Sequence, residues 1–188
     1  MRIVAGSAKG RRLAPVPEGV RPLSDRAREG LFSSLGPDRV ADAMVLDLFA
    51  GTGATGIEAL SRGAARATFV DRSAQAAATV HRNLALTDLG PRGRVEVADA
   101  LRFLRNEERP GAPFDLVFCD PPYELGPPEL DAVLAELATG WLSEESFTVV
   151  LTRGDRSSTP VIPVHWAVAR LLRYGDSLVH LIRPVDQP

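Results

Sequence analysis

The sequence predicts an α/β fold in which helices cover both faces of a mostly parallel sheet. From residue 44 onward, short apolar and β-branched runs alternate with helical patterns. A glycine-rich segment joins the first of these runs to the helical pattern that follows it. Near the end of the chain, two apolar runs are separated only by a short turn. This last pattern predicts a terminal antiparallel hairpin.

Five strands are expected before this hairpin. They are Val45–Leu48, Ala67–Val70, Arg94–Val97, Phe114–Cys119 and Phe147–Leu151. Helices are expected between strands over Thr55–Arg62, Ala74–Leu86 and Pro128–Ala138. The hairpin strands are expected over Val161–Leu172 and Ser177–Ile182, with residues 173–176 between them.

The first forty residues precede the alternating pattern. Residues 1–22 are apolar pieces interrupted by glycine and proline, which predicts a small hairpin or extended arm. Ser24–Leu35 has the pattern of a helix with Ser24 as its N-cap. We therefore expect an arm and helix over residues 1–40 and a larger domain over residues 41–188.

The composition is that of an ordinary globular protein, with 45% hydrophobic and 24% charged residues. There is no secretory h-region, no apolar run of membrane-spanning length and a single cysteine, Cys119, so we expect a cytoplasmic protein. A monomer is expected as well. The three histidines are scattered, and no metal site is expected. Residues 1–40 carry eight basic and four acidic residues. This excess fits either a nucleic-acid contact or a solvated surface.

The segment VLDLFAGTGATGIEAL, residues 45–60, is a strand, a glycine-rich turn and a helix. Glycines let the backbone approach a ligand, and the helix start offers unpaired N–H groups. The segment also matches the dinucleotide fingerprint, and Asp71, which ends the next strand, could bind ribose hydroxyls. An adenosine-containing cofactor is therefore expected.

The acidic residues near this segment favour S-adenosylmethionine (SAM) over NAD. Asp47 would repel a pyrophosphate but suits the cationic amino group of a methionine moiety. Asp99 could meet the adenine amino group, or it could simply cap a helix from Ala100. The residues predicted to bind the cofactor are Asp47, Phe49, Gly51, Gly53, Asp71, Asp99 and Ala100.

The segment FDLVFCDPPYELG, residues 114–126, ends a buried strand with an acid, two prolines and a tyrosine. The Asp120 carboxylate and the Pro121 carbonyl could accept the two N–H groups of an exocyclic amine on a nucleobase. Tyr123 could stack on the base. The alternative is an ordinary turn in which Tyr123 is a packing residue.

VLDLFAGTG together with DPPY resembles the amino-methyltransferases that modify adenine or guanine. MRIVAGSAKGRRL, RPLSDRAREGLFSSL and RYGDSLVHLI extend this to a resemblance to the RsmD family of 16S rRNA guanine-N2 methyltransferases, from Met1 to Ile182. It implies a class I SAM-dependent methyltransferase fold of seven strands, one antiparallel. It also implies methylation of a guanine in small-subunit rRNA, with Asp120, Pro121 and Tyr123 at the target base.

The resemblance suggests that the basic residues near the N-terminus contact phosphates. These predicted rRNA contacts are Lys9, Arg11, Arg12, Arg21, Arg26 and Arg28. Arg26 or Arg28 could instead pair with Asp25 or Glu29 or line the SAM pocket. Residues 174 and 176 are interpreted as parts of a structural turn.

Three other functions are possible. An adenine-N6 methyltransferase would use the same acid-Pro-Pro-aromatic motif. An NAD-dependent oxidoreductase would share the glycine pattern, but the chain lacks a recognisable tyrosine–lysine pair. A non-catalytic assembly factor with a vestigial cofactor loop would not need all of Asp47, Asp71, Asp99 and Asp120.

Overall fold

The computed structural model describes residues 1–15, 23–144, 146–155, 157 and 159–185. Within them, seven strands form one sheet in the order β3-β2-β1-β4-β5-β7-β6. The strands are β1 Met44–Leu48, β2 Arg66–Asp71, β3 Gly93–Val97, β4 Leu116–Cys119, β5 Thr148–Gly154, β6 Trp166–Tyr174 and β7 Ser177–Pro184. Strand β7 runs antiparallel to both of its neighbours, β5 and β6, and is the one antiparallel strand of this sheet, as the resemblance implied.

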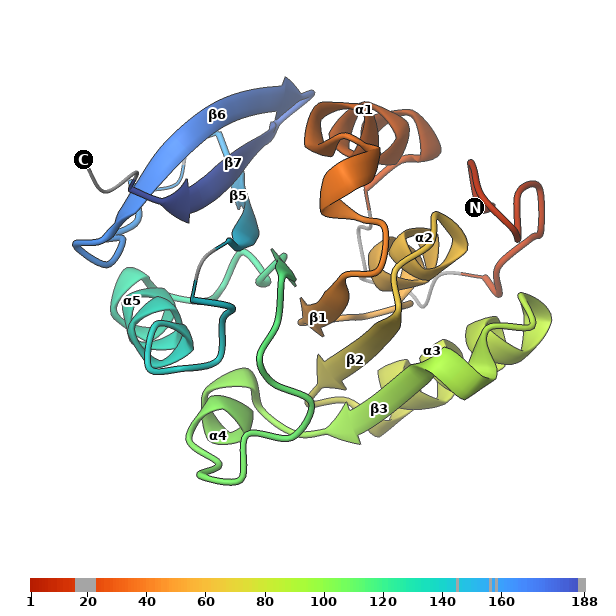
Figure 1. Ribbon diagram of the computed structural model, residues 1–188, viewed down its shortest axis with the longest axis horizontal. Coiled ribbons are helices and arrows are strands. Elements are labelled where there is room, and N and C mark those ends of the chain that lie inside the picture. Colours follow the sequence, from red (N-terminus) through yellow and green to blue (C-terminus); the bar gives the residue numbers. More distant parts are fainter. Residues whose placement is uncertain (16–22, 145, 156, 158, 186–188) are drawn as a thin grey trace.

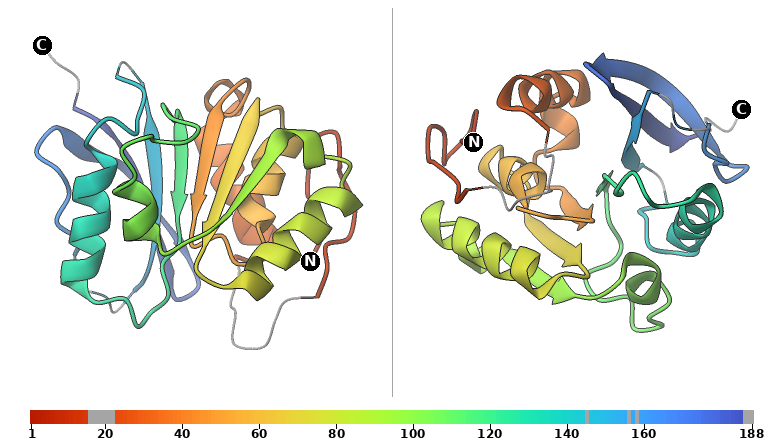
Figure 2. Two further views of the ribbon diagram at one scale, coloured as in Figure 1. Left: turned by 90° about the horizontal axis from the view of Figure 1, so that it is seen from below. Right: turned by 180° about the vertical axis from the view of Figure 1, so that it is seen from behind.

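Five α-helices cover the two faces of the sheet in the described part of the chain (Figure 1). They are α1 Asp25–Leu35, α2 Ala54–Ser61, α3 Ala74–Leu86, α4 Ala100–Leu104 and α5 Pro127–Leu137. Helices α1, α2 and α3 pack into one hydrophobic cluster, and α4 and α5 pack into a second cluster on the opposite face. Figure 2 shows this arrangement of helices on either side of the sheet. The predicted α/β architecture is confirmed.

The N-terminal arm is a small hairpin, one of the two forms that its glycine and proline pattern allowed. Arg2 and Arg12 form an antiparallel bridge. Ile3 and Leu13 are buried in the same cluster as α1 and α2. The arm is therefore packed onto the helical layer. Ser24 caps α1 as predicted, since its hydroxyl accepts a hydrogen bond from the Ala27 N–H at 3.1 Å.

The terminal hairpin differs from its prediction at both ends of its first strand. Residues 161–165 lie outside β6, which begins at Trp166. Pro160 and Pro163 cannot donate hydrogen bonds to a sheet, which explains why the strand begins later than its apolar pattern suggested. At the other end β6 continues to Tyr174, because the hairpin turns tightly at Gly175, whose φ is +59°.

Strand β4 begins at Leu116, two residues later than expected, and Phe114 forms only an isolated bridge to Leu142. Among the described residues, no helix combines the length and the apolar character needed to cross a membrane.

Candidate active site

A cleft of about 1260 Å³ lies at the edge of the sheet where the parallel strands end. Ligands of doubly wound α/β folds bind at this edge. The cleft is larger than the roughly 300–1,000 Å³ of a typical small-molecule pocket, so it has room for a cofactor and part of a second molecule. The predicted site residues that line it are Arg26, Asp47, Phe49, Gly51, Asp71, Asp99, Ala100, Asp120, Pro121 and Tyr123.

The glycine-rich loop has the backbone conformation that its sequence required. Gly51 and Gly53 have φ values of +55° and +71°, in the left-handed region that glycine tolerates. Gly53 does not line the cleft. It lies just behind it, where an added Cβ would be 3.0 Å from the Val80 side chain. Gly53 therefore shapes the loop, and its predicted ligand contact remains a prediction.

Asp47 is the most unusual acid of the cleft, because it is only 4% exposed. Its Oδ2 accepts a hydrogen bond from the Gly56 N–H at 3.0 Å. No basic side chain pairs with it among the described residues. Burial raises the pKa of Asp47 to about 8, the Gly56 hydrogen bond opposes this, and the charges of Asp120 and Asp71 add to it. A cationic ligand would relieve this unfavourable environment.

Asp71 and Asp99 lie at the ends of neighbouring strands, as the sequence predicted. Asp71 fixes the glycine loop, since its Oδ2 accepts from the Gly51 N–H at 2.9 Å while Oδ1 accepts from Ser73. A carboxylate can accept about four hydrogen bonds, so Asp71 retains capacity for ribose hydroxyls. Asp99 caps α4 by accepting from the Leu101 N–H at 3.0 Å, which matches the alternative interpretation of this residue. Because Asp99 also lines the cleft, this cap leaves the predicted adenine contact untested.

Asp120, Pro121 and Tyr123 follow β4 and form another part of the cleft wall. Asp120 is open to the cleft but closely surrounded by protein, and this burial raises its pKa to about 7. The Tyr123 side chain is 60% exposed and packs on Gly154, where an added Cβ would lie 2.9 Å from the ring. The cleft therefore holds a carboxyl group with a raised pKa and an accessible aromatic ring on the same segment.

Helix α1 and the β6–β7 turn form a further wall of the cleft. Arg26 of α1 lines it, as one alternative for this residue anticipated, whereas the contribution of the turn was not predicted. Tyr174 and Asp176, interpreted as structural, both line the cleft. Tyr174 packs against α1 at Gly30, where an added Cβ would lie 2.7 Å from the tyrosine hydroxyl. The hairpin pattern could have predicted that this turn lies at the cleft. A final strand antiparallel to β5 must begin at the edge of the sheet where β5 ends.

The predicted rRNA contacts have different surroundings. Four of them are exposed: Lys9, Arg11 and Arg12 on the arm, and Arg26 at the cleft. Arg11 already pairs with Asp88 at 2.6 Å. Arg21 lies outside the described residues.

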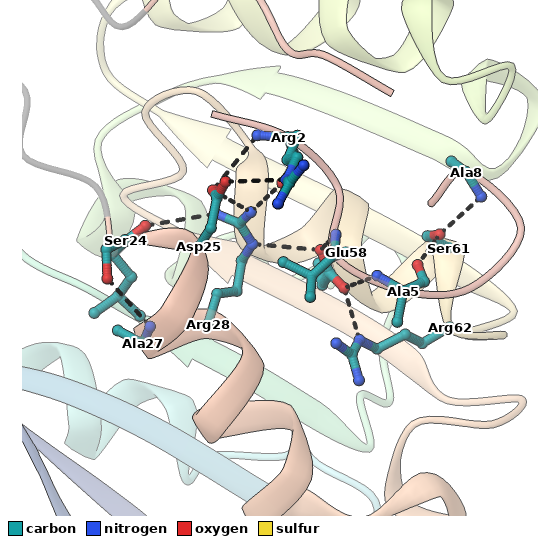
Figure 3. Close-up of polar contacts among 12 residues, drawn as sticks. Arg2, Ala5, Ala8, Ser24, Asp25, Ala27, Arg28, Glu58, Ser61 and Arg62 are labelled. Carbon is teal, nitrogen blue, oxygen red and sulfur yellow. Dashed lines mark hydrogen bonds and ion pairs between the residues drawn. The ribbon is translucent and has the colours of Figure 1, made fainter. Parts of the chain in front are cut away.

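The predicted phosphate contact of Arg28 is wrong, because the Arg28 side chain has no exposed surface. It pairs with Asp25 at 3.0 Å, as the alternative anticipated, and with Glu58 at 3.4 Å. It also donates a hydrogen bond to the Arg2 carbonyl (Figure 3). Arg28 therefore joins the arm to the helices and is not available to a phosphate.

The profile of the Conserved hypothetical protein 95 family matches residues 1–183. The chain belongs to this family. The Escherichia coli K12 protein named ribosomal RNA small subunit methyltransferase D is 40% identical over 90% of this chain and 83% of its own length. The Haemophilus influenzae protein of the same name is 34% identical over 90% of this chain and 86% of its own.

A solved structure agrees with this family membership. Escherichia coli yhhF has a TM-score of 0.85 and 35% identity to the chain, covering 100% of this chain and 99% of that one. The resemblance to the RsmD family and the class I SAM-dependent methyltransferase fold are both confirmed.

Proposed function

We propose that this protein transfers a methyl group from SAM to the exocyclic N2 amine of a guanine in small-subunit rRNA. The observation that carries the proposal is the presence of Asp47 and the Asp120–Tyr123 segment in one cleft. Asp47 suits a cationic cofactor, and Asp120–Tyr123 suits a base that carries an amine. The names of the relatives support an rRNA substrate. Such a substrate also supports a cytoplasmic location.

The cleft residues fit SAM by their chemistry. Asp47 would bind the cationic amino group, Asp71 the ribose hydroxyls and Asp99 the adenine amine. When bound, SAM supplies a methyl group that is already activated on a sulfonium. A pyrophosphate-containing cofactor fits less well, because Asp47 has no basic partner among the described residues to offset its charge.

The protein's own contribution is to position and deprotonate the target amine. The lone pair of an exocyclic amine is delocalised into the ring, so the nitrogen is a weak nucleophile. The Asp120 carboxylate and the Pro121 carbonyl would accept its two N–H groups and orient it. Once the nitrogen has gained the methyl group, it is cationic and must lose one proton. Asp120, with a pKa of about 7, is able to accept that proton.

The remaining residues would hold the RNA. The exposed ring of Tyr123 would stack on the target base, a contact that contributes roughly 1–3 kcal/mol. A base in a stacked region must first swing out, at a cost of a few kcal/mol. Lys9, Arg12 and Arg26 are exposed and would contact phosphates around it.

A methyl-transfer assay with isotopically labelled SAM tests this proposal. The substrates are small ribosomal subunits from cells lacking this gene, naked rRNA and duplex DNA, and the products are digested to nucleosides for mass spectrometry. We expect label in N2-methylguanosine and a loss of roughly 10²–10³-fold in rate on Asp120→Ala, with SAM binding retained. Label in N6-methyladenosine would identify the adenine alternative, and label in no nucleoside would contradict the proposal.

A further inference from the structure

The N-terminal arm is attached to α2, the helix that follows the cofactor loop (Figure 3). The Glu58 carboxylate accepts hydrogen bonds from the Val4 and Ala5 N–H groups at 2.9 and 3.0 Å. One turn later, the Ser61 hydroxyl accepts from the Ala8 N–H at 2.9 Å and donates to the Ala5 carbonyl at 2.6 Å. These contacts hold the arm on α2 but do not reach the cofactor loop itself.

Asn83 on α3 makes the connection to the loop. Its side chain is fully buried. Its Oδ1 accepts from the Ala14 N–H of the arm at 2.7 Å, and its Nδ2 donates to the Thr52 carbonyl of the loop at 2.8 Å. Because an N–H can only donate and a carbonyl can only accept, these two partners fix the orientation of the amide.

The Thr52 carbonyl precedes helix α2, which begins at Ala54 after the N-cap Gly53. It lies outside the helical ladder, whose first bond runs from the Ile57 N–H to the Gly53 carbonyl at 2.9 Å. The Gly56 N–H belongs to the first turn, where N–H groups have no helical partner, and it donates to Asp47. Thr52 is only 2% exposed, so its carbonyl depends on the Asn83 amide for this hydrogen bond. The Asn83 and Asp47 side chains therefore hold the backbone on either side of Gly53.

We propose that Asn83 is a positioning residue for the cofactor loop, held in orientation by the N-terminal arm. Without the Asn83 donor, the buried Thr52 carbonyl is left without its hydrogen bond. The loop between Gly51 and Gly53 is then less ordered before the cofactor binds. This inference rests on the proposed use of SAM, but it does not depend on which base is methylated.

The test compares SAM binding by the wild-type protein, Asn83→Asp, Asn83→Leu and Ser61→Ala, using calorimetric titration and hydrogen exchange. Asn83→Asp keeps the acceptor for Ala14 but loses the donor to Thr52. Asn83→Leu loses both. We expect each Asn83 variant to bind SAM about tenfold more weakly, because a buried carbonyl is left unpaired. The Ala14 amide should stay protected from exchange in Asn83→Asp and become exposed in Asn83→Leu.

Ser61→Ala is the matched control, because it removes an arm contact on α2 without touching the loop. It should expose the Ala8 amide to exchange and leave SAM affinity within twofold of wild type. In the methyl-transfer assay, the Asn83 variants should raise KM for SAM while kcat at saturating SAM stays within twofold, whereas a loss of folded protein would lower kcat alone.

Two results would overturn the inference: Asn83 variants that bind SAM as the wild type does, or a Ser61→Ala variant that weakens binding equally. Thermal melts establish that each titrated variant is folded, and Asn83→Leu keeps the test available if the buried charge of Asn83→Asp prevents folding. Wild-type protein that fails to bind SAM would contradict the proposed function instead, so the two failures are distinguishable.

Discussion

Two buried carboxylates, Glu58 in helix α2 and Asp47 in strand β1, have opposite surroundings. Glu58, which is fully buried, receives hydrogen bonds from the arm backbone and pairs with Arg28 at 3.4 Å and Arg62 at 2.7 Å (Figure 3). Asp47, which is 4% exposed, receives one backbone hydrogen bond and has other acids nearby. Burial is therefore almost the same for the two carboxylates, and the difference lies in their partners.

This difference separates an acid that the protein's own residues neutralise from one that they do not, which supports the proposed role of Asp47 in binding a cationic ligand. Taking a carboxylate out of water is costly unless cations and hydrogen bonds surround it. The protein supplies both to Glu58 from its own residues. For Asp47 it supplies only the Gly56 N–H, so a cation from outside the protein would improve the environment of the carboxylate. The two acids should therefore respond in opposite ways to loss of their charge.

The largest expected effect is on Glu58. Glu58→Gln leaves the buried Arg28 short of a partner and places an amide N–H₂ against backbone donors, which should cost roughly 3–5 kcal/mol of unfolding free energy. For a domain of this size, that corresponds to a fall in Tm of about 10 °C. Thermal melts check this value. Arg62→Ala is the control, because its side chain is 19% exposed and its removal should cost less. An unchanged Tm for Glu58→Gln would show that the comparison is wrong.

Asp47→Asn should weaken SAM binding by about 100-fold, because it removes the charge that faces the cationic amino group. The same change should stabilise the free protein. The folded-state pKa of about 8 lies above the ordinary value of 3.8. Between these values the unfolded chain releases a proton that the folded protein keeps, so wild-type stability falls as pH rises.

The variant lacks this contribution, and it should melt at least about 10 °C above wild type at pH 8 and close to it at pH 4. Titration calorimetry and ligand-free melts at several pH values measure the two effects. A variant that is both weaker in binding and less stable at pH 8 would place Asp47 with Glu58 among the structural acids.

The smallest expected effect is a shift in the pH dependence of binding. SAM affinity should rise by at most about 100-fold as the pH approaches 8 and then level off, as Asp47 becomes ionised. Asp120 raises the pKa of Asp47 by its charge. Asp120→Asn should therefore move the midpoint of this rise to lower pH. Binding curves at half-unit intervals would detect it, and a midpoint that stays in place would show that the two carboxyl groups act independently.

The sequence predicted the parts of the site that depend on local pattern. The glycine loop, Asp47, Asp71 and Asp120 each belong to a strand end, and parallel strands bring their ends to one edge of the sheet. Such placement needs only the strand pattern and the chain order. The cofactor side of the cleft and the Asp120–Tyr123 segment were accessible to sequence reasoning for this reason.

The features that sequence reasoning missed depend on contacts between distant segments. Arg28 was expected at the surface, whereas it is buried against Glu58, which lies 30 positions along the chain. Asn83 was not singled out, because both of its hydrogen-bond partners come from other elements. The place of Tyr174 in the cleft wall was not predicted, because the pairing of β7 with β5 decides which edge of the sheet its turn reaches.

The contact between Tyr174 and Gly30 has a consequence for biosynthesis. One side of the cleft wall comes from α1, near the start of the sequence, and the other comes from the β6–β7 turn, near its end. A nascent chain emerging from the ribosome has its glycine loop and Asp120 well before Tyr174 is made. Domains fold as units once enough of the chain is available. The cleft is therefore completed only once the β6–β7 turn has been made, and a shorter nascent chain lacks the wall that Tyr174 forms.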